Sequence, residues 1–368
     1  MAARIDLGTA TARAGVAGNP SDALGGAAFA VPVEQLVARV ELADADAMAV
    51  ERLDAAASFR SVTALVEHTE RYGHDGGDRL VTAAIVTLQH HLRRHGIAVD
   101  DRPFRAAWST DIPRSVGLAG SSALVIATLR ALASRWRAAL TAPQLAALAL
   151  AAESDELGIA AGWMDRAVQA HGRPTLVDTR SLDPDGTPSM RLVEPASPID
   201  LVVAWDPAGA APSGRLHGDL RAALAAGDPQ VRSAVDDLVV AAHDAAAAVA
   251  SGDVAGLSDA VGRSCALRDR LGALDEITAS MADAVRTVGG AATSAGSGGA
   301  VLAVPGPAGA AALVEQLEAR GWSASTVLLG DHPSVQDRSE ERSAQERSVT
   351  SSTTSPRTSL LDGPTRTS

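Results

Sequence analysis

The sequence predicts a mixed helix-and-strand protein of the α+β class, with strands and helices in both halves of the chain. Residues 11–33 indicate a strand, a turn and a second strand. Residues 112–132 indicate a glycine-rich turn that leads into an amphipathic helix. Residues 289–329 indicate a glycine-rich loop followed by a strand, a helix and a closing strand, which is a βαβ-like ending.

The remaining elements follow from apolar spacing and from turn residues. The first turn lies at Gly18–Asp22, because Asn-Pro, Ser and Asp form turns readily, and the next strand leaves it at Ala27–Val33. Residues 184–198 are predicted to be loop near a domain boundary. The other predicted elements, in chain order, are helices at 64–72, 78–95 and 140–157, strands at 105–111, 175–178 and 201–205, four helices within 215–288, a helix at 308–320 and a strand at 323–329.

Length and composition indicate a folded protein of about two domains. The chain has 368 residues, of which 46% are hydrophobic, and we expect domains at 1–195 and 196–330. Residues 331–368 are rich in Ser, Thr, Arg and Glu, so this tail is predicted to be disordered. The net charge of −12 argues against nucleic acid or an anionic membrane as a partner.

Residue types and segments that the sequence lacks exclude further classes of protein. A single cysteine, Cys265, excludes an intramolecular disulfide and a cysteine-rich metal site. There is no signal-like segment at the N-terminus and no membrane-length apolar run, so we expect a cytoplasmic protein, either a monomer or a homodimer. The chain contains no lysine. Walker A loops, protein kinases and Schiff-base enzymes all need one, so these three classes are excluded.

The segment Ile112–Leu132 carries the clearest chemical signal. A helix is expected to begin near Ser121, directly after Gly117 and Gly120. The first turn of a helix has unpaired N–H groups and partial positive charge, and glycine lets an anion approach the backbone closely. A phosphate could therefore bind here, with the serine hydroxyls free to reach a metal ion. The alternative is a plain Gly-Ser linker that caps a core helix.

Four ordered segments resemble the GHMP kinases, the superfamily of galactokinase, homoserine kinase, mevalonate kinase and phosphomevalonate kinase. IPRSVGLAGSSA (112–123) resembles the phosphate loop of that superfamily, TARAGVAGNPSD (11–22) its first motif and AATSAGSGGAVLAV (291–304) its third. AESDELGIAAGWMD (152–165) is similar to the galactokinase-type stretch in which a glutamate precedes the catalytic aspartate by twelve residues. GNPSD together with IPRxxGLxGSSA most resembles the glucuronokinase-like sugar kinases.

The resemblance, which covers about residues 10–330, implies a two-layer α/β fold. The N-terminal domain would be of the ribosomal-S5-domain-2 type and the C-terminal domain ferredoxin-like, with the active site between them. Departures occur in the first motif, at Gly15 and Ala17, and in the third, where Ser294-Ala295 replaces the usual Ser/Thr-Gly pair. None of these changes removes a charged group, so we expect activity.

The resemblance also implies a role for each matching residue. Asp165 would be the general base for the attacking hydroxyl and Arg13 would stabilise developing charge, although on local sequence Asp165 could equally cap the helix after Met164. Glu153 and Ser122 would bind Mg²⁺. The implied nucleotide-binding residues are Pro113, Gly117, Leu118, Gly120, Ser121, Ser122 and Ala123. The implied acceptor-binding residues are Asn19, Asp22, Gly296 and Gly298.

The expected function is therefore an ATP- and Mg²⁺-dependent kinase that phosphorylates a hydroxyl of a sugar or sugar acid. Glucuronate 1-phosphorylation is the most specific expectation, and Arg114 or Arg166 could bind the uronate carboxylate. Two alternatives remain: a mevalonate-type or heptose-phosphate kinase, or a non-catalytic binding protein that kept the fold. The presence of Asp165, Glu153 and Arg13 favours an enzyme.

Overall fold

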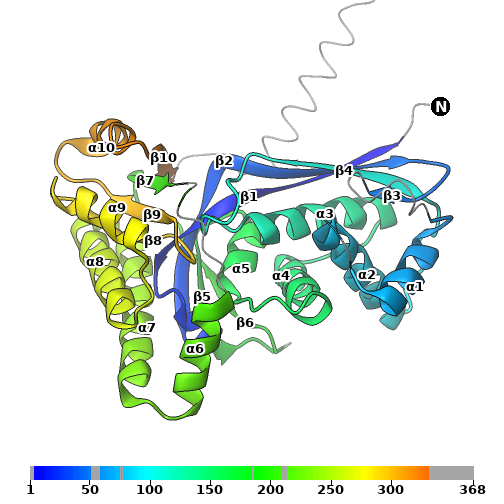
Figure 1. Ribbon diagram of the computed structural model, residues 1–368, viewed down its shortest axis with the longest axis horizontal. Helices are drawn as coiled ribbons and strands as arrows, with labels where there is room; N and C mark the ends of the chain where they lie inside the picture. Colours follow the sequence, from blue (N-terminus) through cyan, green and yellow to red (C-terminus); the bar gives the residue numbers. More distant parts are fainter. Residues whose placement is uncertain are drawn as a thin grey trace, which may run out of the picture. The chain divides into compact units, whose positions relative to one another are not determined.

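The computed structural model describes residues 4–330, with gaps at 51–58, 75, 77, 185, 207 and 209–213, and only the backbone of 214–218 (Figure 1). The predicted tail at 331–368 lies outside the described residues. By their contacts the described residues belong to one compact unit, and the predicted domain boundary at 195/196 falls inside it.

The elements of the described part follow one another in this order: β1 (Ile5–Ala17), a 3₁₀ turn η1 (Ser21–Leu24), β2 (Ala27–Asp44), β3 (Ala49–Val50), α1 (Val62–Tyr72), α2 (Arg79–Arg94), β4 (Phe104–Thr110), α3 (Gly120–Trp136), α4 (Ala142–Ala151), a π-helical turn η2 (Ala152–Glu156), α5 (Met164–His171), β5 (Thr175–Leu182), β6 (Pro188–Leu192), β7 (Ile199–Trp205), α6 (Gly214–Ala225), α7 (Pro229–Ser251), α8 (Val254–Arg270), α9 (Glu276–Arg286), β8 (Ala291–Ser294), β9 (Ala300–Val304), α10 (Gly309–Glu318) and β10 (Ser323–Leu329).

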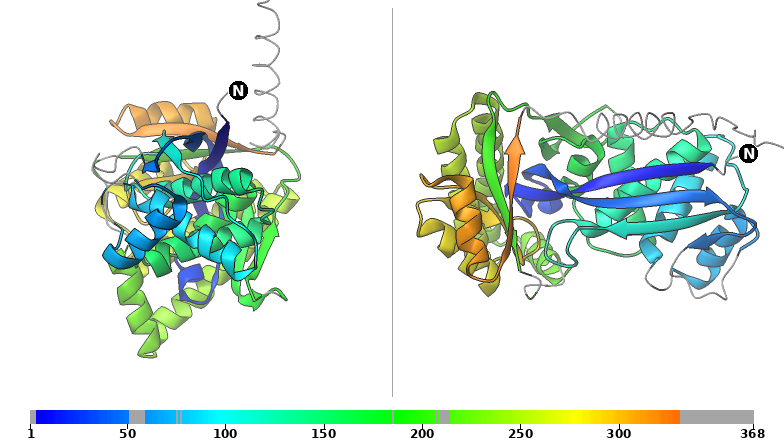
Figure 2. Two further views of the ribbon diagram at one scale, coloured as in Figure 1. Left: turned by 90° about the vertical axis from the view of Figure 1, so that its right-hand side faces the viewer. Right: turned by 90° about the horizontal axis from the view of Figure 1, so that it is seen from above.

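The larger sheet is organised around β1 and β2, which run antiparallel side by side (Figure 2). Its order is β3-β4-β2-β5-β6, with β1 paired to β2 outside this path. The first residues of β2 pair with β5 and its last residues with β4. Ala38, Val40 and Leu42 alternate with more exposed residues, so this part of β2 buries one face only.

Helices cover one face of the larger sheet (Figure 1). Helices α3 and α5 pack directly on β1 and β2, and α2 and α4 pack on α3 and α5. Twelve of the seventeen residues of α3 are buried, including Ile126 and Leu129. This burial fixes the beginning of α3, and with it the glycine-serine turn, beside β1, where the backbone N–H of Arg13 donates to the carbonyl of Leu118.

The smaller sheet has the order β10-β7-β9-β8, with antiparallel neighbours throughout. Helices α8, α9 and α10 cover it and share its core, which includes Val202, Val301, Met281 and Leu313. Helix α7 packs on α8 and also on β2, so it connects the two sheets. The hairpin between β8 and β9 carries the third glycine-rich motif.

The structure differs from the sequence-based expectation at three strands. The strand predicted at Ala27–Val33 continues to Asp44, because alternation persists beyond the apolar run. Residues 188–192, predicted to be loop, form the edge strand β6, whose Pro188 stands at the strand start where no ladder N–H is needed. Part of the predicted glycine loop, Ala291–Ser294, is strand β8, which pairs with β9.

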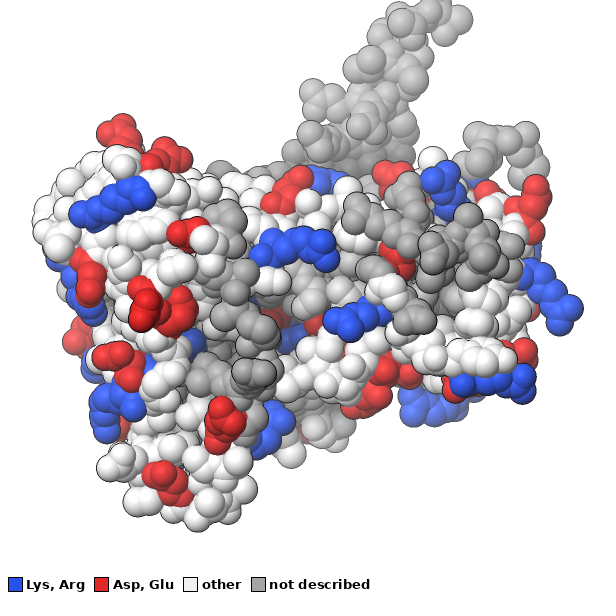
Figure 3. Space-filling view, viewed as in Figure 1, with Lys and Arg blue, Asp and Glu red and all other residues white. Residues whose placement is uncertain are grey.

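The described surface does not concentrate one sign of charge on the face shown in Figure 3, where arginine and acidic side chains are interspersed. Of the helices that the structure describes, none combines the length and the apolar character needed to cross a membrane.

Candidate active site

The glycine-serine turn between β4 and α3 has the backbone of an anion-binding loop. Helix α3 begins at Gly120, one residue before the predicted start. Ser115, Gly117 and Ala119 have positive φ angles of 60°, 79° and 61°, so the chain turns sharply before the helix. The first N–H groups of a helix carry partial positive charge. A phosphate bound at this end of α3 would meet them directly.

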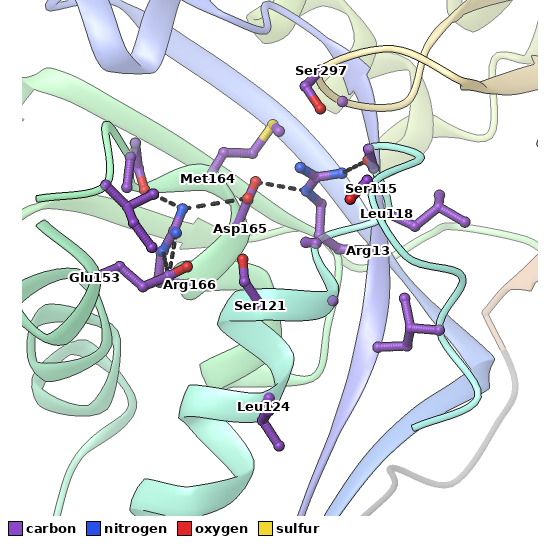
Figure 4. Close-up of a pocket in the computed structure, with 18 of the residues that line it drawn as sticks. Arg13, Ser115, Leu118, Ser121, Leu124, Glu153, Met164, Asp165, Arg166 and Ser297 are labelled. Atoms are coloured by element: carbon purple, nitrogen blue, oxygen red, sulfur yellow. Dashed lines mark hydrogen bonds and ion pairs between the residues drawn. The ribbon is translucent and has the colours of Figure 1, made fainter. Parts of the chain in front are cut away.

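This turn forms one wall of a cavity of about 420 Å³ (Figure 4). The cavity gathers all four motif segments, although they are far apart in the sequence. Its lining residues fall within 13–23, 79–80, 108–124, 153–166 and 296–297. Of the predicted site residues, Ser122, Ala123 and Gly298 do not line it.

Arg13 joins three of these segments. Its Nε donates a hydrogen bond of 2.6 Å to Oδ1 of Asp165, and its Nη1 donates to the carbonyls of Gly117 at 2.7 Å and Ala295 at 2.8 Å. Figure 4 shows the guanidinium between Asp165 and the phosphate-loop turn. Asp165 lies at the beginning of α5 with its side chain 20% exposed, so its carboxylate is held in place and still accessible from the cavity.

Glu153 and Arg166 form a buried ion pair beside Asp165. Glu153 lies in the π-helical turn that follows α4, an irregularity that often occurs at functional sites. Its Oε2 accepts hydrogen bonds from Nε of Arg166 at 2.8 Å and from Nη2 of the same side chain. Arg166 also donates to Oδ2 of Asp165 at 3.3 Å. Burial alone would lower the pKa of Arg166, but the carboxylates of Glu153 and Asp165 outweigh it and the pKa is raised.

The oxygen atoms beside this ion pair fit Mg²⁺. Oε1 of Glu153 is buried and accepts no hydrogen bond from the described residues, so it keeps its lone pairs for a cation. The hydroxyl of Ser121 lies on the cavity wall nearby (Figure 4). Carboxylate and hydroxyl oxygens are hard ligands of the kind that Mg²⁺ prefers. The structure places Ser122 differently: its side chain is fully buried and its hydroxyl donates to the carbonyl of Ala119 at 3.2 Å.

Asn19 and Asp22 line the cavity on the side of the β1–β2 loop. Oδ2 of Asp22 accepts a hydrogen bond of 3.0 Å from the backbone N–H of Met164, at the beginning of α5. Nδ2 of Asn19 donates to the carbonyl of Gly296 at 3.2 Å. Both side chains therefore connect the first motif to segments that carry Asp165 or the third motif, and both line the cavity with polar groups.

The third motif approaches the phosphate-loop turn through its glycines. A Cβ on Gly296 would lie 2.1 Å from the carbonyl oxygen of Gly117. A Cβ on Gly117 would lie 2.8 Å from the carbonyl oxygen of Gly298. The two backbones can meet at this distance only without side chains. Gly298 thus faces the loop rather than the cavity, and its predicted contact with the acceptor stays a prediction.

We expect Gly296→Ala to lower the free energy of unfolding by about 1–3 kcal/mol, as overpacking of a dense interior usually does. The new methyl group must displace the carbonyl of Gly117, so KM for ATP should also rise. Gly262→Ala in α8 is the matched control, because its Cβ would meet no atom within 4 Å. That substitution should be neutral or stabilise by about 0.5–1 kcal/mol. Urea denaturation and ATP titrations measure both effects, and equal behaviour of the two variants would contradict the close approach.

Sequence reasoning missed the cavity wall formed by α2 and β4. Arg79, Leu80, Trp108 and Thr110 line it. Nε1 of Trp108 donates to Oδ1 of Asp78 at 2.7 Å, which ties the end of β4 to the beginning of α2. These residues belong to no recognised motif, and they meet only because β4 passes the beginning of α2, so the sequence carried no signal for them.

Known kinases are similar to this chain in sequence. The family model described as the GHMP kinases N terminal domain matches residues 79–173, which include the phosphate-loop turn, Glu153 and Asp165. The chain is 29% identical over 332 residues to probable glucuronokinase 2 of Arabidopsis thaliana and 27% identical over 331 residues to glucuronokinase 1 of the same plant. Each alignment covers 86% of this chain and 90% of the plant protein.

Solved structures with the same fold are more distant in sequence. The phosphomevalonate kinase of Streptococcus pneumoniae in complex with phosphomevalonate and AMPPNP superposes with a TM-score of 0.69 at 16% identity, over 87% of this chain and 99% of that one. The galactokinase of Lactococcus lactis complexed with galactose gives 0.65 at 16% identity, over 88% of this chain and 93% of that one. These likenesses confirm the predicted α+β fold.

Proposed function

We propose that this chain is a kinase of the GHMP type, which transfers the γ-phosphoryl group of ATP to a hydroxyl of a sugar or sugar acid. The proposed acceptor is glucuronate, phosphorylated at O1. The observation that carries the proposal is the position of Asp165, which Arg13 holds at 2.6 Å on the wall of the cavity that also contains the phosphate-loop turn. The names of the two plant relatives support the choice of a uronate, and the AMPPNP complex of the pneumococcal kinase supports ATP as the donor.

In the proposed reaction, the backbone N–H groups at the beginning of α3 bind the phosphates of ATP. Asp165 accepts the proton of the attacking hydroxyl as general base. Arg13, which contacts both Asp165 and the carbonyl of Gly117, orients the carboxylate toward the phosphate-loop turn. Asn19 and Asp22 hold the acceptor hydroxyls. Phosphoryl transfer depends mainly on such positioning and on neutralising the charge of the transferred group.

Mg²⁺, when bound, would neutralise phosphate charge. Oε1 of Glu153 and the hydroxyl of Ser121 are the oxygen atoms that the cavity offers for it. Ser122, expected from the motif to be a ligand, would first have to give up its hydrogen bond to Ala119. We therefore propose that Ser121 is the serine ligand of Mg²⁺ and that Ser122 stabilises the turn through its hydrogen bond to Ala119.

An assay of ADP release over a panel of acceptors tests the proposal. We expect turnover with glucuronate and Mg²⁺-ATP, and a sugar 1-phosphate as the product, identified by ³¹P NMR. Galactose, glucose, a heptose phosphate and mevalonate complete the panel, and a reaction without acceptor gives the background. Turnover with mevalonate or the heptose phosphate alone would refute the sugar-acid assignment. No turnover above background with any acceptor would favour a binding protein.

A further inference from the structure

Helix α8 contributes a buried arginine to the back of the cavity. The side chain of Arg268 is only 1% exposed, and it is the largest of the fully buried side chains in the described part of the chain. Its guanidinium donates to three backbone carbonyls: Nη1 to Asn19 at 3.0 Å, and Nη2 to Gly296 at 3.0 Å and Ala273 at 2.9 Å. Asn19 and Gly296 both line the cavity, so Arg268 lies directly behind its wall.

The charge of Arg268 has no carboxylate in contact with it among the described residues. All its hydrogen bonds go to neutral carbonyls, and its Nε donates to no described group. Burial lowers its pKa to about 10, so it remains protonated at neutral pH. The carboxylate of Asp275 favours the charged form of Arg268 from nearby but forms no hydrogen bond or ion pair with it. A buried cation without a paired carboxylate is unfavourable, and such groups are usually paired. Its presence therefore needs a reason beyond packing, which an aliphatic side chain could provide.

The other arginines of the cavity differ in this respect. Arg13 contacts Asp165, and Arg166 contacts Glu153 and Asp165, so carboxylates in contact with them offset their charges. Arg79 and Arg114 line the cavity with exposed side chains, where water and salt screen them. Arg268 thus has neither a carboxylate in contact with it nor solvent to offset its charge, and Asp275 affects it only from a distance. Its guanidinium contacts the Asn19 and Gly296 carbonyls instead.

The peptide groups bound to Arg268 are oriented by it. Because the carbonyl oxygen of Gly296 points toward Arg268, the N–H of Ser297 in the same peptide group points away from it. Asn19 and the hydroxyl of Ser294 donate to the same carbonyl oxygen, which fixes the orientation further. Ser297 lines the cavity, and its N–H donates to no group of the described residues. Charge and peptide dipole therefore both favour an anion at this wall.

We propose that Arg268 is a positioning and selectivity residue of the acceptor site, which makes the wall formed by Asn19 and Gly296 favour an acceptor with an anionic group. The inference rests on the proposed function, because it concerns the acceptor of the same cavity. It differs from a purely structural role, in which Arg268 would only join the loops of Asn19, Ala273 and Gly296. Loss of a structural link would weaken all acceptors equally, whereas loss of the charge would weaken anionic acceptors alone.

The test is the ratio of the dissociation constants of glucose and glucuronate, measured by calorimetry with Mg²⁺ and AMPPNP present. The wild type should bind glucuronate at least about tenfold more tightly, the order expected for a charge several Å away at an effective dielectric constant of about 20. Arg268→Gln should remove most of this ratio, whereas Arg268→Lys should keep most of it. Arg263→Gln, also on α8 but exposed and paired with Asp244 and Asp259, is the matched control and should leave the ratio unchanged.

Two further measurements test the proposed role of Arg268 even if both Arg268 variants fail to fold. The preference of the wild type should persist at 0.5 M salt, because a buried charge is poorly screened. It should also survive in Arg79→Gln. A wild type without preference, a preference lost in salt or in Arg79→Gln, or a folded Arg268→Gln that retains it would each overturn the inference. Because the ratio compares affinities, it is independent of whether ADP release is observed.

Discussion

Asp165→Asn is expected to lower kcat by about 10²–10⁴-fold, the usual contribution of a general base. The amide keeps the shape of the carboxylate and can still accept the hydrogen bond from Nε of Arg13, which is 2.6 Å long in the wild type. It cannot take the proton of the attacking hydroxyl. In the proposed reaction the nucleotide binds at the phosphate-loop turn, away from the substituted group, so the Kd for AMPPNP should change little. Single-turnover kinetics and a nucleotide titration measure the two quantities separately.

Asp155→Asn is the matched control for this experiment. Asp155 is an exposed acid of the π-helical turn, two residues after Glu153, and its Oδ1 accepts a hydrogen bond of 2.8 Å from the hydroxyl of Ser154. Its replacement removes the same charge from the same region without touching the proposed base, so kcat should stay within about threefold of the wild type. A rate of Asp165→Asn equal to that of the control would exclude the general-base role.

Arg166→Met should lower the free energy of unfolding by about 3–5 kcal/mol, which is typical when one partner of a buried ion pair is removed. Arg166 is 4% exposed and Glu153 is fully buried, so the remaining carboxylate would lose its counter-ion without gaining contact with water. Equilibrium denaturation in urea, with an unchanged m-value, would measure the loss.

The comparison variant is Arg173→Met, which breaks an ion pair of the same type at the surface. The side chains of Arg173 and Glu194 are 46% and 63% exposed, so water can replace the lost contact. Exposed pairs contribute about 0–1 kcal/mol. If the two substitutions lower the free energy of unfolding by similar amounts, the prediction that the buried Glu153–Arg166 pair contributes more to stability than an exposed pair is wrong.

Local sequence was sufficient for the elements that depend on near neighbours. The beginning of α3 was predicted to within one residue, because glycines followed by apolar residues at helical spacing determine both the turn and the helix. Helices α1, α2, α7 and α8 were found for the same reason. The strands β6 and β8 were missed, since each becomes a strand only by pairing with a neighbour.

For the site, too, the sequence predicted some features and the structure alone decided others. The resemblance to the GHMP kinases implied that Asp165, Arg13, Glu153 and the phosphate-loop turn share a site, and the structure places all of them around one cavity. The motif could not show which of the two adjacent serines reaches the cavity. Successive side chains on a helix point about 100° apart, and packing decides which one is buried. The structure buries Ser122 and exposes Ser121.

The sequence by itself carried the resemblance to the GHMP kinases, the positions of the four motif segments and the absence of any lysine for phosphate binding. Only the tertiary structure decided which charges meet. The pairing of Arg166 with Glu153, and the position of Arg268 behind Asn19 and Gly296, depend on contacts between residues up to 249 positions apart. Such contacts form when helices pack on a sheet, and that packing is a property of the whole chain rather than of any segment.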